Sequence, residues 1–371
     1  MNYAKISAGE VIDINWGNTS ITKESYTHEG YVAFSASGAD GFLPSFEHEG
    51  EGVVLSAIGA NCGKCFYANG KWTAIKNTIT FAPKDKENVD FRFLFYYLNQ
   101  PDIFRSHGGG QPFITLETSR NLQIPLPPLT DQERIASLLA RADRLRQLRR
   151  TAHELGDALL QSVFLEMFGD PETNPKGWDA DDFEKTILST QNGFGQREDF
   201  SPNGTIVLRI RDISSGKVDL SDPRRMIIPE KELAKYALES KDLIVVRVNG
   251  NPNYVGIASE FTEQKEPVVF SDHVIRIRMN KEILNTTFVV YLLNSPYGRK
   301  QTLGNISTTA GQFTINSSGI SRIKMIHPPL SLQEEFAGVV ARVEGLRGRM
   351  GESTRQVEGL FESLLSEVFD G

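Results

Sequence analysis

The chain has 371 residues, 39% hydrophobic and 23% charged, which predicts two or three globular domains with cores of their own. The first residues lack a basic-then-apolar leader pattern and no run of 18 apolar residues occurs, so we expect a cytoplasmic protein without a membrane-spanning helix. The formal net charge of −7 argues against a basic surface over the whole molecule; any nucleic-acid binding would require local basic faces.

Residues 1–125 predict a first domain of mixed α and β structure. Apolar and β-branched runs at 52–55 and 78–81 predict strands, and clusters of Gly, Asn, Asp and Pro between such runs predict turns. Residues 93–99 predict a short helix. Polar residues come after the two strands, and four of them are candidates for a binding surface: Asn61, Lys64, Lys76 and Asn77.

The only cysteines of the chain, Cys62 and Cys65, form a C-x-x-C pair. A structural zinc site needs four ligands, and neither a second pair nor a nearby group of histidines supplies the other two. We therefore interpret the two cysteines as reduced thiols with no metal and no redox role.

Residues 126–170 predict a connecting helix over 131–168. Two prolines precede a Thr-x-x-Glu pattern, Thr130 with Glu133, which is typical of a capping box at a sharp helix start. Its apolar residues form a weak heptad pattern, broken at Arg149 and Gly156. The residues predicted to pack against a second helix are Ile135, Leu138, Leu145, Leu159 and Val163.

Residues 171–325 predict a second domain with the same kind of structure. Runs at 205–210, 243–248 and 273–277 predict strands, and residues 288–294 predict a short helix. Arg and Asn side chains gather around these strands; Arg suits the edge of guanine and Asn the edge of adenine, although solvated surface residues are the plainer explanation for any single one. The candidates for such contacts are Arg197, Arg209, Arg211, Arg247, Asn249, Asn251, Asn253 and His273.

The segment from Asn251 to Tyr254 resembles the Asn-Pro-Pro-aromatic motif of amino-methyltransferases, with Asn253 at the third position. No strand, glycine-rich turn and helix for S-adenosylmethionine precedes it. We therefore favour a polar loop after the strand at 243–248, and keep a degenerate modification enzyme as an alternative.

Residues 326–371 predict a second long helix over 332–369, again after two prolines and a capping-box pattern, Ser331 with Glu334. Its heptad pattern is more regular than that of the first helix. The residues predicted to pack between the helices are Phe336, Val343, Leu346, Val357, Leu360 and Leu364.

The second half of the chain repeats the first. The segment from Ile124 and the segment from Met325 align without a gap at an offset of 201, with 14 identities over 45 positions. The short helices at 93–99 and 288–294 match at an offset of 195, so the second copy holds six extra residues after them. Because a lone long helix cannot bury its apolar stripe, we expect the two to pack antiparallel as a rod of ~57 Å.

These segments resemble the specificity subunits of type I restriction–modification systems, and the resemblance covers nearly the whole chain. It is carried by the two helix starts, the end of the first long helix and the strands of both domains. The matching segments are residues 31–38, 59–61, 126–135, 159–164, 168–171, 174–178, 208–213 and 241–247.

The resemblance implies two α+β target-recognition domains separated by antiparallel coiled-coil helices with approximate twofold symmetry. It also implies a non-catalytic subunit that reads a bipartite sequence in double-stranded DNA, one half-site per domain. Partners would be two modification (methyltransferase) subunits and restriction (endonuclease/translocase) subunits. They would bring S-adenosylmethionine, ATP and magnesium, while this chain would hold no cofactor and no metal.

Two alternatives stay open at this point: the DNA-reading part of a stand-alone adenine methyltransferase complex without restriction, and the degenerate modification enzyme suggested by Asn251 to Tyr254. The missing cofactor-binding unit argues against the second.

Overall fold

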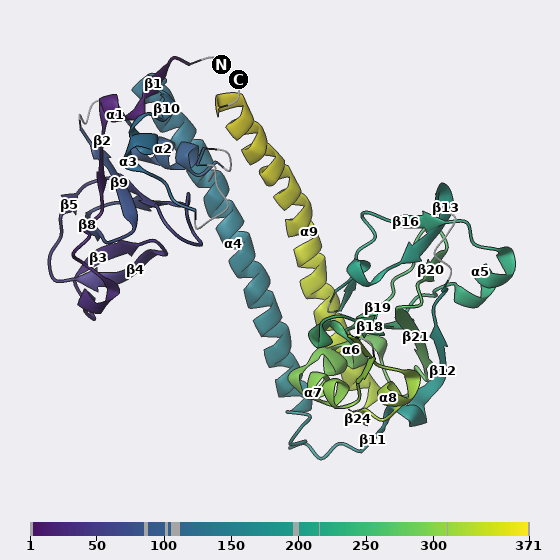
Figure 1. Cartoon of the computed structure of the whole chain (residues 1–371). Helices are drawn as coiled ribbons and strands as arrows, with labels where there is room; N and C mark the ends of the chain where they lie inside the picture. The colour runs from purple at the N-terminus through teal and green to yellow at the C-terminus, as the bar shows by residue number, and fades with distance from the viewer. Residues whose placement is uncertain are drawn as a thin grey trace. The chain divides into compact units, whose positions relative to one another are not determined.

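The computed structural model describes residues 3–84, 88–100, 103–104, 112–195, 200–214, 216–309 and 311–369. The chain divides into two compact units (Figure 1): residues 1–151 with 350–371, and residues 152–349. Each unit therefore contains one domain and part of both long helices. Among the described residues, no helix has the length and apolar character needed to cross a membrane.

The first unit alternates short strands with short helices before the first long helix. Its elements are β1 (Lys5–Ser7), α1 (Ala8–Val11), β2 (Ile12–Trp16), η1 (Lys23–Ser25), β3 (Tyr31–Ser35), β4 (Gly38–Leu43), β5 (His48–Glu49), β6 (Gly52–Ser56), β7 (Cys65–Ala68), β8 (Lys71–Ala74), β9 (Thr78–Pro83), α2 (Phe91–Leu98), α3 (Leu116–Arg120), β10 (Gln123–Pro125) and the start of α4 (Leu129–Phe168).

Two four-stranded sheets form the body of the first unit. One sheet has the order β2-β9-β6-β7 and is antiparallel. The other has the order β4-β3-β8-β5, in which β3 and β8 run parallel. Val53, Leu55, Ile79 and Phe81 of the first sheet are fully buried and pack with Leu94 of α2. β6 is buried on both faces, since Val54, between Val53 and Leu55, joins a separate cluster with Trp72.

The second unit contains counterparts of the main elements of the first, together with additional ones. They are β11 (Ala180–Asp182), η2 (Phe183–Thr186), β12 (Ile187–Asn192), β13 (Phe200–Leu208), η3 (Ile210–Asp212), β14 (Ile213–Ser214), β15 (Lys217–Val218), β16 (Arg224–Met226), α5 (Glu230–Tyr236), β17 (Leu243–Val246), β18 (Val248–Asn249), η4 (Pro252–Tyr254), β19 (Ala258–Glu260), β20 (Val268–Phe270), β21 (Val274–Met279), α6 (Thr286–Asn294), α7 (Pro296–Gly304), β22 (Ser307–Thr309), β23 (Gln312–Thr314), α8 (Ser317–Ser321), β24 (Lys324–Ile326) and α9 (Leu330–Phe369).

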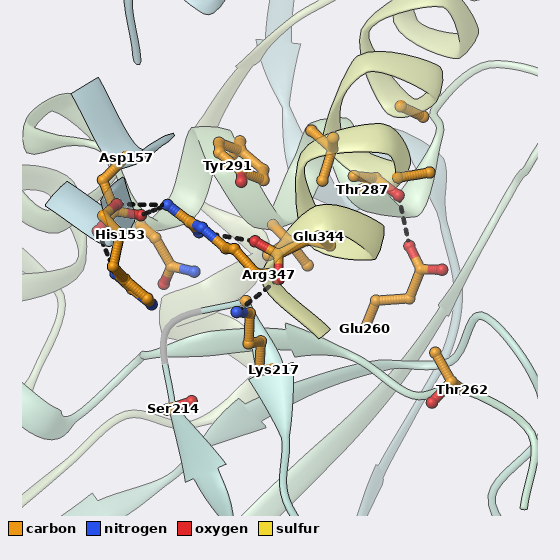
Figure 2. A pocket seen from close by; sticks show the side chains of 16 residues that line it. His153, Asp157, Ser214, Lys217, Glu260, Thr262, Thr287, Tyr291, Glu344 and Arg347 are labelled. Atoms are coloured by element: carbon orange, nitrogen blue, oxygen red, sulfur yellow. Dashed lines mark hydrogen bonds and ion pairs between the residues drawn. The ribbon is translucent and has the colours of Figure 1, made fainter. Parts of the chain in front are cut away.

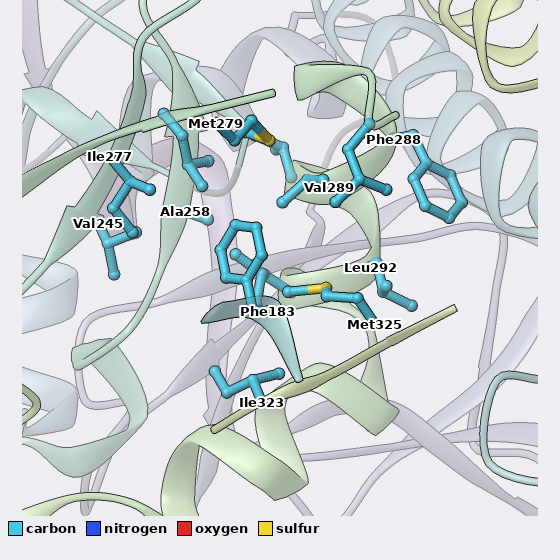
Figure 3. Close-up of a cluster of buried hydrophobic side chains, with 14 of the residues drawn as sticks. Phe183, Val245, Ala258, Ile277, Met279, Phe288, Val289, Leu292, Ile323 and Met325 are labelled. Carbon is cyan, nitrogen blue, oxygen red and sulfur yellow. The ribbon is translucent and has the colours of Figure 1, made fainter. Parts of the chain in front are cut away.

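One sheet of the second unit has the strand order of its counterpart in the first unit, whereas the other has three strands, β16-β13-β20, where the first unit has four. The order β12-β21-β17-β19 matches β2-β9-β6-β7, and the parallel pair β13 and β20 matches β3 and β8. Figure 3 shows its main core, where Phe183, Val245 and Ile277 meet Phe288 of α6 and Met325 of β24. The predicted duplication therefore extends from the sequence to the strand order.

The predicted strands and helices appear within a few residues of their expected positions, but the helix caps differ. Both long helices begin at a leucine, Leu129 and Leu330, and their first backbone bonds go to the carbonyls of Pro128 and Pro329. Thr130 and Ser331 therefore lie inside the first turn, and the predicted capping boxes are wrong. A proline provides the cap because its carbonyl accepts normally although it has no N–H to donate.

In place of the expected caps, a buried glutamine near the start of each long helix connects that helix to its domain through hydrogen bonds. The Gln132 amide donates to the carbonyls of Asn88 (3.0 Å) and Pro127 (2.8 Å), and its oxygen accepts from the Asp90 N–H at 2.9 Å. Gln333 makes the same three bonds, to Ile283 (3.0 Å), to Pro328 (2.8 Å) and from the Asn285 N–H (2.8 Å).

Within the second unit the two long helices run antiparallel. Phe164 of α4 packs edge-on against Phe336 of α9, with ring centroids 5.4 Å apart. Two turns earlier in α4, Asp157 bonds Arg347, which lies three turns later in α9, at 2.7 Å. Residue numbers therefore rise along one helix as they fall along the other, which is the predicted direction.

The apolar residues predicted to pack between the helices have different environments. Phe336 is fully buried, and Ile135, Val163 and Val343 are partly buried, whereas the leucines at 138, 145, 159 and 346 are 37–53% exposed. The side chains of Val357, Leu360 and Leu364 lie outside the described part of the chain.

The prediction that the helix pair buries these leucines is therefore corrected. The fully buried large apolar residues of α4 are instead Leu139, Leu160 and Phe168, with Phe164 nearly so. Leu160, Phe164 and Phe168 have a spacing of four and join the core of the second unit. Packing against the domain thus selects an i, i+4 face of the helix in place of the heptad positions.

Candidate nucleic-acid interface

In the second unit, several predicted side chains lie where β17 ends. The Arg247 N–H donates to the His273 carbonyl at 2.7 Å, and the Arg247 guanidinium donates to the Asp272 carbonyl at 2.6 Å. Arg209, Arg211 and His273 line one pocket of ≈350 Å³. The fold therefore brings together four residues that are up to 64 positions apart in the sequence.

Among the three arginines that line this pocket, Arg209 and Arg211 pair with carboxylates. Arg209 binds the buried Asp212 through its side chain at 2.7 Å and through its backbone N–H at 2.8 Å, which closes the η3 turn. This hydrogen bonding raises the pKa of Arg209. Arg211 pairs with Asp222 at 2.9 Å, and both side chains are about two-thirds or more exposed. Exposed pairs of this kind are weak, so Arg211 is the more available for a phosphate or a base.

The loop after β17 presents a row of amides in a fixed conformation. The Asn249 side chain accepts from the Asn251 N–H at 2.9 Å, and the Asn251 side chain accepts from the Asn253 N–H at 3.0 Å. Asn251, Asn253 and Tyr254 are exposed. Because Asn251 and Asn249 already use one acceptor each, Asn253 keeps the most hydrogen-bonding capacity for an adenine edge.

In the first unit, the predicted residues flank the end of β6 in the same way. The Ser56 N–H donates to the Lys64 carbonyl at 2.9 Å, and the Ala57 N–H donates to the Asn77 carbonyl at 3.0 Å. Asn61, Lys64, Lys76 and Asn77 are all exposed. Asn77 has a φ of +71°, a left-handed conformation that asparagine tolerates, so its place in the turn has a structural reason too.

The two sets occupy equivalent places. The Asn77 carbonyl accepts a hydrogen bond from the Ala57 N–H, and the His273 carbonyl accepts the equivalent bond from the Arg247 N–H. The next bonds also match: Ile114 donates to the Ala57 carbonyl at 2.8 Å, and Ile315 to the Arg247 carbonyl at 2.9 Å. Arg197 lies outside the described residues. The two domains therefore share this pattern of backbone hydrogen bonds, which we call the backbone frame, and expose different side chains on it.

The chain's relatives point to one protein family. Residues 2–154 match the family model of the type I restriction modification DNA specificity domain. The StySPI specificity subunit of Salmonella potsdam is 29% identical over 67% of this chain, and the EcoKI specificity subunit of Escherichia coli K12 is 27% identical over 67%. The chain is similar to the type I restriction–modification specificity subunits.

The fold has a structural counterpart over the full chain. A crystal structure of a type I S subunit from M. genitalium superposes with a TM-score of 0.68 at 15% identity, covering 100% of this chain and 96% of that one. The alignments with the StySPI and EcoKI specificity subunits span 57% of the length of each. The two similar domains and long helices expected from the resemblance are thus confirmed.

The two cysteines of the chain lie in the first domain. Cys65 is 3% exposed, and burial raises the pKa of its thiol, so it is a poor thiolate at neutral pH. Among the described residues, no group of three or more His, Cys, Asp or Glu side chains is arranged to hold a metal ion. The geometry therefore gives Cys65 a packing role.

The sequence pattern did not predict a charged network in the second unit. Figure 2 shows it lining a pocket of ≈630 Å³ between α9, α6 and the β14–β15 hairpin. Lys217 pairs with Glu344 at 2.5 Å, Glu344 with Arg347 at 2.7 Å, and Arg347 with Asp157 at 2.7 Å. This chain of ion pairs connects the hairpin to α9 and α9 to α4.

Gly156 explains how the Arg347 side chain fits between the helices. A Cβ atom at Gly156 would lie 2.7 Å from the Arg347 guanidinium, which also donates to the His153 carbonyl at 2.9 Å. The sequence pattern identifies Gly156 only as an interruption of the heptads, because the arginine that needs this gap becomes apparent only from the packing.

Proposed function

We propose that this chain is the non-catalytic, sequence-reading subunit of a type I restriction–modification complex. It binds a bipartite sequence in double-stranded DNA, one half-site per domain. It also holds two methyltransferase subunits and the restriction subunits in place. Its site of action is the cytoplasm, where such DNA is accessible.

One observation carries the proposal: the two domains share a backbone frame but differ in the residues they present at the same place. Lysine and asparagine flank the end of β6 in the first domain, and Arg247, His273 and an asparagine-rich loop flank the end of β17 in the second. A scaffold that is retained while its exposed loops diverge is expected of a protein that reads two different sequences.

The catalytic chemistry belongs to the partners in this proposal. S-adenosylmethionine would bind the methyltransferase subunits, and ATP with magnesium the restriction subunits. In this chain, Asn251 and Tyr254 belong to the short η4 turn, and the Asn251 side chain caps that turn. The StySPI and EcoKI relatives are specificity subunits, which favours a reading role for this loop over a methyl-transfer role.

The test compares the purified chain alone with the chain mixed with its cognate methyltransferase subunit. Alone, it should neither bind S-adenosylmethionine nor methylate DNA. Its DNA affinity should be low because its net charge is −7, and should fall steeply with salt because binding depends on contacts with phosphates. The mixture should methylate a defined two-part target. Methylation by the chain alone, or methylation by the mixture without any sequence preference, would contradict the proposal.

A further inference from the structure

The loop after β17 in the second domain is longer than its counterpart in the first. The first loop is closed by a bond from the Gly63 N–H to the Ser56 carbonyl (2.9 Å), and the second by a bond from the Gly256 N–H to the Val246 carbonyl (2.7 Å). The first bond encloses residues 57–62 and the second encloses residues 247–255, nine residues against six. Within the second loop, β18 is held by its pairing with β23, so it is residues 250–255 that need support of their own to hold one conformation.

Arg299 of α7 provides a contact to this longer loop. Its Nη2 donates to the Asn253 carbonyl at 3.0 Å and approaches the Pro252 carbonyl at 3.5 Å. Those two carbonyls belong to the η4 turn, whose Asn253 and Tyr254 side chains are exposed. The arginine thus holds the backbone of the turn while leaving those two side chains on the surface.

The surroundings of Arg299 fix it in this position. Gly256, with a φ of +77°, lies against α7, and a Cβ there would meet the Thr302 methyl group at 2.2 Å and the Arg299 Nη1 at 3.4 Å. Thr302 is 1% exposed, and burial lowers the pKa of Arg299. A half-buried guanidinium with a carbonyl partner loses little further conformational freedom when the loop meets a ligand.

In the first domain, a different residue packs against the glycine that closes the loop. Gly63 is the equivalent of Gly256, and a Cβ there would meet the Phe104 carbonyl oxygen at 3.3 Å and the Phe104 Cβ at 3.4 Å. α7 lies in the stretch where the second copy has six more residues than the first. The longer loop and the helix segment that supports it are therefore both differences between the two copies.

We propose that Arg299 is a positioning residue for DNA recognition by the second domain: it sets the conformation of the 247–255 loop and thereby the second half-site. The inference rests on the proposed function. In addition to the proposed function, it assigns to Arg299, a residue outside the candidate DNA-reading surface, control over the conformation of the loop that carries this surface.

The first experiment measures the loop without DNA, by hydrogen exchange of the full chain over residues 249–257. In Arg299→Ala this segment should exchange about tenfold faster or more, as expected when a charged group's hydrogen bond is lost. The matched control is Lys300→Ala, because Lys300 is 70% exposed on the same helix and pairs with Glu172, away from the loop. Equal exchange in both variants would overturn the inference.

If Arg299→Ala lowers the melting temperature of the whole chain, Arg299→Lys replaces it. Lysine keeps the charge and the aliphatic stem, but its ammonium nitrogen ends one bond short of the Nη2 that contacts the two carbonyls. The 249–257 segment should then exchange faster at an unchanged melting temperature; unchanged exchange in this variant would overturn the inference as well.

The second experiment maps methylated sites in complexes assembled with the methyltransferase subunit. Arg299→Ala should relax the second half-site and leave the first unchanged, whereas Lys300→Ala should change neither. Asn253→Ala separates the two hypotheses. If it alters the second half-site while Arg299→Ala does not, the positioning role is wrong and the reading role stands. If the unaltered complex has no defined target, both are wrong.

Discussion

The two buried glutamines show how single residues fix the start of each long helix. Gln132 and Gln333 are fully buried, and each satisfies two carbonyls and one N–H that belong to the loops before α4 and α9 and to the starts of α2 and α6. Buried groups of this kind cost free energy when they lose their partners.

Gln132→Ala should therefore lower the free energy of unfolding by about 2–4 kcal/mol, because three buried polar groups lose their partner at once. Gln333→Ala should have a similar effect. Gln147→Ala is the control, since Gln147 is exposed and bonds only Asp143 among the described residues. Denaturant unfolding measures the difference; a loss for Gln132→Ala no larger than that of the control would contradict this stabilising role.

His48 gives the first domain a dependence on pH. Its ring stacks on the buried Trp72 with centroids 4.2 Å apart, and burial lowers its pKa, with the nearby Glu47 opposing the shift. A histidine with a lowered pKa in the folded state takes up a proton more readily when unfolded. Its contribution to stability is therefore present above its unfolded pKa of about 6.5 and is lost as pH falls from there through the folded pKa.

His48→Gln should reduce the loss of thermal stability between pH 7 and pH 5, because the side chain that titrates is gone. Melting temperatures of the two proteins across this range, measured at one ionic strength, provide the test. Parallel curves for the two proteins would show that His48 is not responsible.

Among the helices, the crossing of α4 and α9 in the second unit depends on Gly156. A glycine inside a helix usually costs stability relative to alanine, by about 1 kcal/mol. Here, however, a Cβ atom would displace the Arg347 guanidinium, which is 11% exposed and bonds both Asp157 and the His153 carbonyl.

Gly156→Ala should therefore fail to stabilise the protein. Gly338→Ala in α9 should gain up to about 1 kcal/mol, because a Cβ there would lie 3.9 Å from the Arg342 guanidinium, an ordinary van der Waals contact. In an Arg347→Ala background, Gly156→Ala should regain the usual benefit. Unfolding free energies of the original chain, both single variants and the double variant at positions 156 and 347 form a double-mutant cycle. An equal gain at both glycines in the original background would contradict this role for Gly156.

The same elements show how far prediction from the sequence reaches. The duplication, the strand runs and both long helices were predictable from periodicity and from the repeated Pro-Pro-Leu-x-x-Gln-Glu motif. The faces of the helices were not, because the packing of Leu160 and Phe164 against a domain core overrides the heptad pattern. Arg209 was predicted as a candidate contact without its bond to the buried Asp212, which only the folded chain reveals.

At the scale of the whole molecule, the helix α4 runs without interruption from Leu129 to Phe168 and connects the two domains. Four residues inserted after Arg150 would lengthen it by ~6 Å and rotate the later residues of the helix by about 40°. In the assembled complex we expect either weaker assembly or a changed spacer between the half-sites, with both half-site sequences retained. An insertion that leaves assembly and spacer unchanged would show that α4 does not set the spacing.

Paired variants provide the sharpest test of whether each domain reads its own half-site. Arg247→Ala and Asn253→Ala alter the second domain, and Asn61→Ala and Lys64→Ala alter the first. In complexes with the methyltransferase subunit, sequencing of methylated DNA should show the first pair relaxing one half-site and the second pair relaxing the other. Each lost base contact should cost about 1–3 kcal/mol. Equal losses at both half-sites from a variant in one domain would contradict independent reading.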